Sequence, residues 1–382
     1  MPERTEEQKA FADSIRAFAA KYLADGALER AHDPHYSWDT AKLLASQGLL
    51  GLTIPEADGG QGASLMDAVI AIQELALICP KSADIVQAGN FGAIRTLAEF
   101  ATQEQKERYL PALLEGRELI ALAMSEPEAG SAVTELGTTA TEDGDEYVIN
   151  GSKIWSTHSS DATVYLVYVR FGSGTDGIGS VLVDRGTPGL TVGEPSAYMS
   201  GEAWSQLYFE DCRIPKENIL LGPGGFKKQM SGFNVERIGN SSRSIAIGRH
   251  AFNLAREHVL QREQFGRPLC EFQGLQWKFA EAAVALDSAQ LLLERAVNNA
   301  VNGLPSAYDT AVAKLAANEA GFLAANTAMQ AMGAMGYSTE SLVEYCMRRT
   351  RGWMIAGGST EILKNRIAES VFGRRFSQRG RA

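Results

Sequence analysis

The segment LQWKFAEAAVALDSAQLLLERAV, residues 275–297, decides how the C-terminal part of the chain folds. Its apolar residues recur at spacings of three and four, the period of one helix face, and the pattern holds for about six turns. The members of this stripe are Leu275, Phe279, Ala282, Leu286, Ala289, Leu293 and Val297. A stripe of this length predicts that a bundle of long helices closes the chain.

Helical spacing also marks the start of the chain. Phe11, Ile15, Phe18 and Tyr22 follow one another at spacings of four, three and four. Similar patterns continue through residues 41–50, 65–78 and 103–114. Residues 1–120 are therefore predicted to form an N-terminal α-helical domain.

The sequence pattern changes between the two helical parts, where short runs of β-branched and aromatic residues alternate with turn residues. The runs cover residues 146–149, 153–157, 163–171, 180–183 and 206–209. Asn150-Gly151 is typical of a hairpin turn between the first two runs. We predict an α+β protein with an antiparallel β domain at 121–226 and a C-terminal helical bundle at 227–382.

Composition excludes several classes of protein. The 382 residues are 45 % hydrophobic and 21 % charged, which is too apolar for a disordered chain. The net charge of -10 opposes binding to nucleic acid, whose phosphates are also negative. The four cysteines, Cys79, Cys212, Cys270 and Cys346, form no CxxC pair, so neither a zinc site nor a disulfide framework is predicted.

The same composition predicts a cytoplasmic location. The first residues are charged where a signal peptide would have an apolar core. No apolar run approaches the ~20 residues that span a bilayer. We therefore expect a soluble protein that is neither exported nor inserted in a membrane.

Two motifs in the middle of the chain are candidates for ligand binding. The first, ALAMSEPEAGS at 121–131, offers backbone N–H groups and the hydroxyls of Ser125 and Ser131, which suit a ring edge or a phosphate. The second, INGSKIWST at 149–157, places Trp155 and Thr157 on one face of a predicted strand, which suits a planar heteroaromatic ligand. Taken singly, the first is explained equally well by an ordinary turn, and a strand tryptophan is more often part of the core.

These two motifs, on this order of domains, resemble the acyl-CoA dehydrogenase family of flavoproteins. Three later segments agree, and the resemblance covers nearly the whole chain. REQFGRPLCEFQ at 262–273 resembles the family's Arg-x-x-Phe-Gly run, QAMGAMGY at 330–337 its Gln-x-x-Gly-Gly-x-Gly-Tyr segment, and IAGGSTEI at 355–362 its Gly-Thr-Ser-Glu-Ile element. The resemblance implies the acyl-CoA dehydrogenase fold, whose C-terminal domain is a four-helix bundle, and FAD as the cofactor.

The resemblance also implies which residues hold FAD. In the middle domain they are Met124, Ser125, Gly130, Ser131, Trp155, Ser156 and Thr157. In the C-terminal domain they are Gln273, Gln330, Gly333, Ala334, Ser359, Thr360 and Glu361. Arg262 and Phe265 would reach the FAD of a neighbouring subunit, which implies a homo-oligomer, most simply a tetramer. Taken singly, each of these residues is more typical of a surface arginine, a helix glutamine or a glycine-rich turn.

The chain departs from the family pattern at two positions. Ala132 stands where the family usually has Asp, and Gly357 stands where many members carry the catalytic Glu. A carboxylate is needed because the reaction removes the α-proton of a thioester while the β-hydrogen leaves as hydride to flavin N5. In isovaleryl-CoA and long-chain dehydrogenases the Glu lies in an earlier helix, and FNVERI at 233–238 resembles that segment.

Glu236 is therefore the candidate base, and Arg237 resembles a residue that contacts CoA. The alternative is a solvated Glu-Arg pair on a helix. Glu236, Asn240 and Arg243 at i, i+4 and i+7 share a helix face and would line the site of a polar or anionic acyl group. Alternatively, Arg243 pairs with Glu236, weakening it as a base, or faces a subunit contact.

The expected substrate-binding residues are Ser131, Phe233, Arg237, Asn240, Arg243, Gly357 and Gly358. Three functions follow from these residues. The leading one is α,β-dehydrogenation of an acyl-CoA or acyl-carrier thioester, with Glu236 as base, Gly357 contributing its backbone N–H, and an electron-transfer flavoprotein as acceptor. The second is an elimination without net dehydrogenation, such as the action of a desulfinase on a sulfinated acyl-CoA. The third is a non-catalytic scaffold, against which the intact flavin motifs argue.

Overall fold

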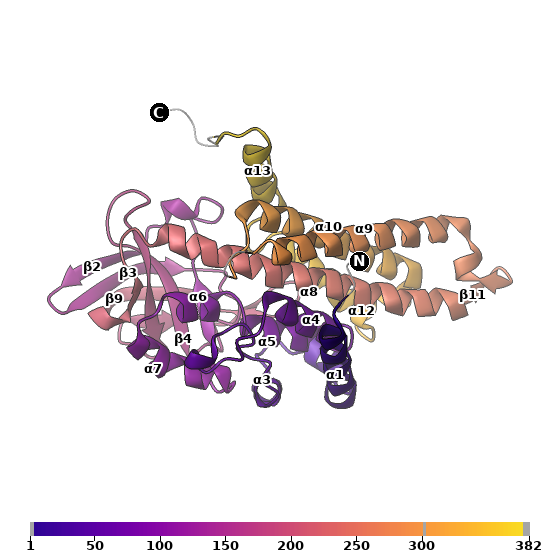
Figure 1. The fold of residues 1–382 in the computed structure, drawn as a ribbon, viewed down its shortest axis with the longest axis horizontal. Helices are drawn as coiled ribbons and strands as arrows, with labels where there is room; N and C mark the ends of the chain where they lie inside the picture. The colour runs from indigo at the N-terminus through magenta and orange to yellow at the C-terminus, as the bar shows by residue number, and fades with distance from the viewer. Residues whose placement is uncertain (1–3, 301–302, 377–382) are drawn as a thin grey trace. The chain divides into compact units, whose positions relative to one another are not determined.

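The computed structural model describes residues 4–300 and 303–376, which form two compact units. The helical unit lies within residues 1–31, 65–84 and 234–382, and the sheet unit comprises 32–64 and 85–233 (Figure 1). The predicted N-terminal helical segment contributes to both units. The domain boundaries at 120/121 and 226/227 stay predictions.

Long helices dominate the helical unit, as predicted. Helix α9 (Gln273–Asn298) packs against α10 (Ala307–Met332), and α10 also contacts α12 (Leu342–Trp353) and α13 (Thr360–Val371). Within the predicted stripe, Ala282, Leu286, Ala289, Leu293 and Val297 are buried. The other helices are α1 (Glu6–Tyr22), α2 (Ala27–His32), α4 (Leu65–Ala76), α5 (Pro80–Ala88), α8 (Phe226–Gln261) and α11 (Ala334–Tyr337); α2, α5 and α8 run across unit boundaries.

Helices α8 and α10 approach each other unusually closely, because glycines meet at their crossing. A Cβ atom on Gly248 would lie 2.7 Å from the Cα of Gly321, and a Cβ on Gly321 would lie 2.4 Å from the carbonyl oxygen of Ser244. Ser244 Oγ donates a hydrogen bond to the carbonyl of Ala317 at 3.0 Å. Polar side chains of α8 can therefore reach those of α10 directly.

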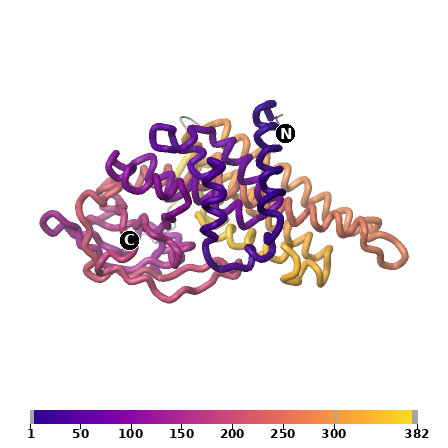
Figure 2. Tube along the Cα trace, turned by 90° about the horizontal axis from the view of Figure 1, so that it is seen from below, coloured from indigo at the N-terminus to yellow at the C-terminus, as the bar shows by residue number. Residues whose placement is uncertain are grey.

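A small hairpin of strands β11 (Glu263–Gln264) and β12 (Arg267–Pro268) joins α8 to α9. Figure 1 shows this hairpin at one end of the α8–α9 pair and α13 toward the other. In Figure 2 the same connection projects, in orange, beyond the other helices of the helical unit. It is therefore well separated from α13.

The sheet unit contains an eight-stranded sheet, in the order β10-β5-β4-β2-β3-β9-β6 with β1 paired to β4. Helices α6 (Ala93–Phe100) and α7 (Gln103–Leu114) share an apolar core with its strands, and α3 (Trp38–Ser46) precedes them. The strands are β1 (Ile120–Ala123), β2 (Thr139–Asp143), β3 (Glu146–Lys153), β4 (Val164–Arg170), β5 (Ile178–Asp184), β6 (Leu190–Val192), β9 (Leu207–Pro215) and β10 (Ile219–Leu221). Strands β7 (Ser196–Ala197) and β8 (Ala203–Trp204) form a separate pair.

Three expectations for this unit are wrong. The sheet is mixed, since β1 and β2 each pair with β4 in parallel, although the other pairs are antiparallel. Asn150 and Gly151 lie inside β3 and make no hairpin turn; Gly151 has φ +143° at a register shift opposite β9. The Asn150 amide and Asp211 bond each other across the ladder, at 2.8 and 3.2 Å, and so stabilise a bulge. The strand expected at 153–157 ends at Lys153.

Within residues 4–300 and 303–376, the structure contains no helix that is both long and apolar enough to cross a membrane.

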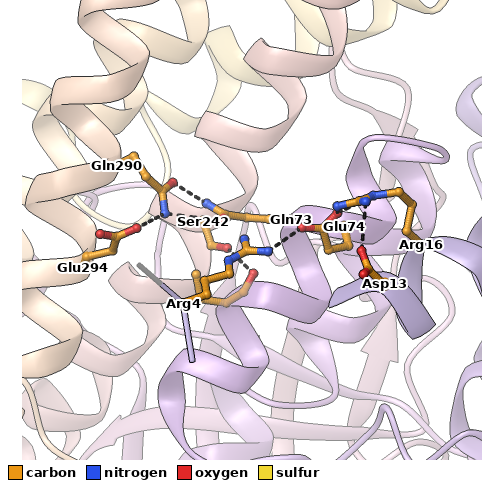
Figure 3. Close-up of polar contacts among 9 residues, drawn as sticks. Arg4, Asp13, Arg16, Gln73, Glu74, Ser242, Gln290 and Glu294 are labelled. Atoms are coloured by element: carbon orange, nitrogen blue, oxygen red, sulfur yellow. Dashed lines mark hydrogen bonds and ion pairs between the residues drawn. The ribbon is translucent and has the colours of Figure 1, made fainter. Parts of the chain in front are cut away.

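Helix α4 is tied to its neighbours on two sides (Figure 3). On one side the buried carboxylate of Glu74 pairs with Arg4 at 2.8 Å and with Arg16 at 2.7 Å. On the other side Gln73 donates to Gln290 of α9 at 2.7 Å, and Gln290 donates to Glu294 at 3.0 Å. Ser242 of α8 also donates to the backbone of α4, at the carbonyl of Val69.

Glu74→Gln should lower the free energy of unfolding by about 1–2 kcal/mol, because it removes a buried charge from two ion pairs whose arginines are partly solvated. Urea unfolding of variant and wild type measures this. Glu6→Gln is the control, since Glu6 pairs with Lys9 on the surface and its loss should change little. Equal effects of the two changes would contradict the account.

Candidate functional site

Two glycines between α12 and α13 form the centre of the predicted site in the helical unit. Gly357 and Gly358 have φ values of +71° and +97°, in the region that favours glycine. Both carbonyl oxygens face cations: Arg237 Nε lies 3.5 Å from that of Gly357, and Lys314 Nζ donates to that of Gly358 at 3.0 Å. A Cβ on Gly357 would lie 3.4 Å from Lys314 Cε. The diglycine segment is thus packed against two positive charges.

Helix α8 carries the three residues predicted to form a polar wall, and their role in binding an acyl group stays a prediction. Asn240 and Arg243 are buried, and Glu236 is half-buried. The amide oxygen of Asn240 accepts a hydrogen bond from Asn318 of α10 at 2.9 Å. Glu236 lies close enough to Lys314 for its negative charge to favour the ammonium form of that lysine.

Lys314 is a completely buried lysine that the sequence analysis missed. Burial lowers its pKa to about 7, with further lowering by Arg237 and Arg243 and an opposing effect of Glu236. A signal was present in the sequence: Lys314 and Asn318 stand at i and i+4 among alanines of the AVAKLAANEA segment. Two polar residues on an otherwise apolar face of a bundle helix need buried partners.

Arg243 pairs with Asp84 of α5 at 2.8 Å, and Arg349 of α12 contacts the other carboxylate oxygen of Asp84 at 2.7 Å. Both guanidinium groups lie over the ring of Trp353, at 4.7 and 4.9 Å. Arg243 therefore forms its ion pair with Asp84. The sequence had left open a pair with Glu236 instead. Arg243 Nε is buried without a hydrogen-bond partner among the described residues.

The sheet unit holds the first flavin motif against the end of β3. The backbone N–H of Ile154 donates to the carbonyl of Ser125 at 2.9 Å, and Lys153 Nζ donates to that of Met124 at 3.2 Å. Lys153 also pairs with Glu126 at 2.6 Å, and burial lowers the pKa of this lysine to about 8. These bonds bring the loop after β1 beside the segment that follows β3.

The second motif has a different local structure from the one expected. Trp155 has φ +62°, so Trp155 and Thr157 do not share a strand face. The Trp155 ring is 55 % exposed, with its centroid 4.3 Å from that of Trp204, and Thr157 makes an isolated β-bridge to Trp204. Ser156 Oγ is buried without a hydrogen-bond partner in the described part of the chain. Gly130 and Ser131 are exposed.

The predicted flavin residues of the helical unit fall into two groups. Arg262 and Phe265 lie at the β11–β12 hairpin, where Phe265 has φ +52° and is 93 % exposed. The other residues of this unit lie at or near helix ends, where Ser359 caps α13 by accepting from the N–H of Ile362. They are Gln330, Gly333, Ala334, Ser359, Thr360 and Glu361, whereas Gln273 begins α9 directly after the hairpin and belongs with the first group. One chain therefore does not bring the hairpin and the α13 cap together (Figure 1).

These groups fit a flavin cofactor. The buried hydroxyl of Ser156 needs a partner, because an unsatisfied buried polar group is costly. The exposed Trp155 ring offers a flat apolar surface beside it. Arg262 is exposed, and its planar fork suits a pyrophosphate.

The order of the fold along the chain, helical then β then helical, agrees with the comparison with known proteins. Family models of the acyl-CoA dehydrogenase N-terminal, middle and C-terminal domains match residues 5–117, 121–212 and 223–372. The chain belongs to the acyl-CoA dehydrogenase family. Members of this family are FAD-dependent oxidoreductases.

Relatives of more than one activity are similar to this chain. A 3-sulfinopropanoyl-CoA desulfinase of Paraburkholderia xenovorans is 33 % identical, over 99 % of both chains. The mouse mitochondrial short-chain specific acyl-CoA dehydrogenase is 35 % identical, over 93 % of this chain and 87 % of that one.

Solved structures are similar over nearly the whole chain. Butyryl-CoA dehydrogenase from Megasphaera elsdenii has a TM-score of 0.90 at 31 % identity and covers 97 % of this chain and 99 % of its own. A chain from work on the electron transferring flavoprotein of Acidaminococcus fermentans has a TM-score of 0.91 at 29 % identity, with the same coverage.

Asp84→Asn should lower the free energy of unfolding by about 3–5 kcal/mol near neutral pH, because it leaves two buried guanidinium groups without their carboxylate. Burial alone would raise the pKa of Asp84, but Arg349, Arg243 and Lys81 hold it below its usual value. The stabilisation is therefore complete above the unfolded-state pKa and is lost as the pH falls through the lower folded-state value. Urea unfolding at several pH values should show the gap closing in acid; a gap that does not change with pH would refute this role.

Proposed function

We propose that this chain removes the α-proton of an acyl-CoA thioester with Glu236 while it oxidises the bond between the α and β carbons. The observation that carries the proposal is the contact between Arg237 and the carbonyl of Gly357. This contact brings the turn of α8 that carries Glu236 next to the Gly357-Gly358 segment, where many family members carry their catalytic Glu. A base on α8 is therefore close to the position that Gly357 leaves without a side chain.

The residues of the chain divide the chemistry between them. Glu236 accepts the proton, and the backbone N–H of Gly357 hydrogen-bonds the thioester carbonyl, where negative charge develops. Ser131, Phe233, Arg237 and Gly358 contact the thioester. FAD, when bound, supplies the acceptor for the hydride. Within the sheet unit, the two flavin motifs would hold its ring; within the helical unit, the predicted residues at helix ends would contact other parts of FAD.

A second candidate is an elimination without net oxidation, and one observation favours it. Although Arg243 pairs with Asp84 through another nitrogen, its Nε is buried without a hydrogen-bond partner among the described residues, so an anionic acyl terminus has a donor to bind. The similarity to 3-sulfinopropanoyl-CoA desulfinases supports the same class of substrate.

Anaerobic addition of butyryl-CoA and of 3-sulfinopropanoyl-CoA separates the candidates. Flavin bleaching supports dehydrogenation, and loss of the sulfinate group without bleaching supports elimination. A colourless protein supports the non-catalytic scaffold.

We also infer that the working form is a homotetramer that passes electrons to an electron-transfer flavoprotein. The separation of the β11–β12 hairpin from α13 supports the oligomer, since the flavin residues of the hairpin, Arg262 and Phe265, need a second chain to complete a flavin site (Figure 1). The similarity to a chain studied with an electron transferring flavoprotein supports the electron acceptor. The thioester carrier is CoA in this proposal, and a carrier protein is the alternative.

Glu236→Gln should slow flavin reduction by ~10²–10⁴-fold, since glutamine keeps the size of the side chain and its hydrogen bonding but cannot take a proton. Stopped-flow absorbance with a saturating acyl-CoA measures the rate. FAD content and acyl-CoA affinity should stay at wild-type values, which separates loss of the base from misfolding. Reduction at the parent rate would show that another group abstracts the proton.

Arg262→Ala should lose FAD, because the hairpin arginine is expected to bind the pyrophosphate of a neighbouring chain. The ratio of flavin to protein absorbance after gel filtration measures this. Arg256→Ala is the control, since Arg256 pairs on the surface with Glu257. A monomer at micromolar concentration with one FAD per chain would overturn the shared site.

A further inference from the structure

The ammonium group of Lys314 has three acceptors around it. It donates to Asn318 Oδ1 at 2.9 Å, and to the carbonyls of Trp353 and Gly358, each at 3.0 Å. These acceptors belong to α10, to the end of α12 and to the diglycine segment. One buried group therefore links three parts of the helical unit.

The same group is connected to helix α8. Asn318, which accepts from Lys314, donates through its own amide to Asn240 at 2.9 Å. Asn240 is one turn beyond Glu236 on α8. The chain of hydrogen bonds therefore runs from the diglycine segment through α10 to the helix that carries the candidate base.

The three acceptors match the protonated form of lysine. An ammonium has three N–H donors, whereas a neutral amine has two and presents a lone pair to the third acceptor. Loss of the proton would therefore break one of the three contacts and set a lone pair against an oxygen atom. Turning the Asn318 amide to offer its NH₂ to that lone pair would cost the bond that the amide donates to Asn240, and the two backbone carbonyls cannot turn.

We propose that Lys314 is a positioning residue whose protonated ammonium anchors the Gly357-Gly358 segment to α10 and α12. The proposal rests on the role given above to that segment in thioester binding. Because glycine has no Cβ, both residues can adopt many backbone conformations, so an anchor is needed to keep the positive φ angles that they have here. Lys314 acts through the backbone and does not touch the reacting atoms.

The anchor should depend on pH. Glu236, Arg237 and Arg243 face Lys314 from α8, and Arg366 of α13 acts in turn on Arg237. Trp353 and Gly358 present only backbone carbonyls. Because the pKa of Lys314 lies at about 7, the ammonium is present below neutral pH and is lost as the pH rises above it. The Gly357-Gly358 segment should therefore become more mobile as the pH rises above neutral.

Hydrogen exchange of the flavin-loaded protein tests the anchor without measuring activity. At pH 6 the amides of residues 355–361 should exchange at least about tenfold faster in Lys314→Met than in wild type, the range expected for a lost charge-assisted bond. At pH 9 the wild type should approach the variant. Lys364→Met is the matched control, because Lys364 is an exposed lysine of α13 that pairs with Glu319 of α10, and it should exchange like wild type.

The results separate the anchor from the proposed function. Wild-type protection of residues 355–361 that does not change between pH 6 and pH 9, measured against the intrinsic exchange rates, overturns the anchor even if the variant fails to fold. Equal exchange of Lys314→Met and wild type at pH 6 also overturns the anchor.

If exchange responds as predicted, the anchor is supported. In that case kcat/KM should fall above pH 7 in wild type, and the pH profile of Lys314→Met should lack this limb, that is, the fall above pH 7. A kcat/KM without this limb in wild type would leave the anchor in place and count against the role of the diglycine segment in catalysis.

Discussion

The close approach of α8 and α10 at Gly248 and Gly321 is the constraint on which the rest of the helical unit depends. Any side chain at either glycine would collide with the backbone of the other helix. Because the two backbones touch there, Ser244 bonds directly to the carbonyl of Ala317. A few residues earlier on each helix, Asn240 and Asn318 meet in the same way. The glycine crossing thus sets the distance at which polar side chains of the two helices can pair.

Charged groups of the helical unit are also buried with partners. Lys314 is surrounded by three oxygen acceptors, and Asp84 is shared by Arg243 and Arg349. Buried charges are tolerated only when they are paired and hydrogen-bonded. The backbone also differs between the two positions proposed for the base. A glutamate at 357 would need a left-handed backbone at φ +71°, whereas residue 236 lies in an ordinary helix and carries no such strain.

Periodicity predicted the helices well, and for a physical reason. The α9 stripe is buried, and residues 103–114 coincide with α7, because each helix packs one face on a core. Asn150-Gly151 failed as a hairpin turn because Asp211, sixty-one residues away, bonds Asn150 and stabilises a bulge. No local pattern contains that pairing. Asp84 was missed likewise, since its partners Arg243 and Arg349 come from distant helices. Glu236 became the candidate base because a resemblance, and not periodicity, pointed to it, and that role stays a prediction.

Proton exchange at the α-carbon tests the assignment of Glu236 most directly. Acetyl-CoA has no β-carbon, so the flavin-loaded protein can remove and return its α-proton but can neither oxidise it nor eliminate a group from it. In D₂O, mass spectrometry of recovered acetyl-CoA should show deuterium in the acetyl group with wild type and only the uncatalysed amount with Glu236→Gln. Equal deuterium incorporation by the two proteins would contradict the account.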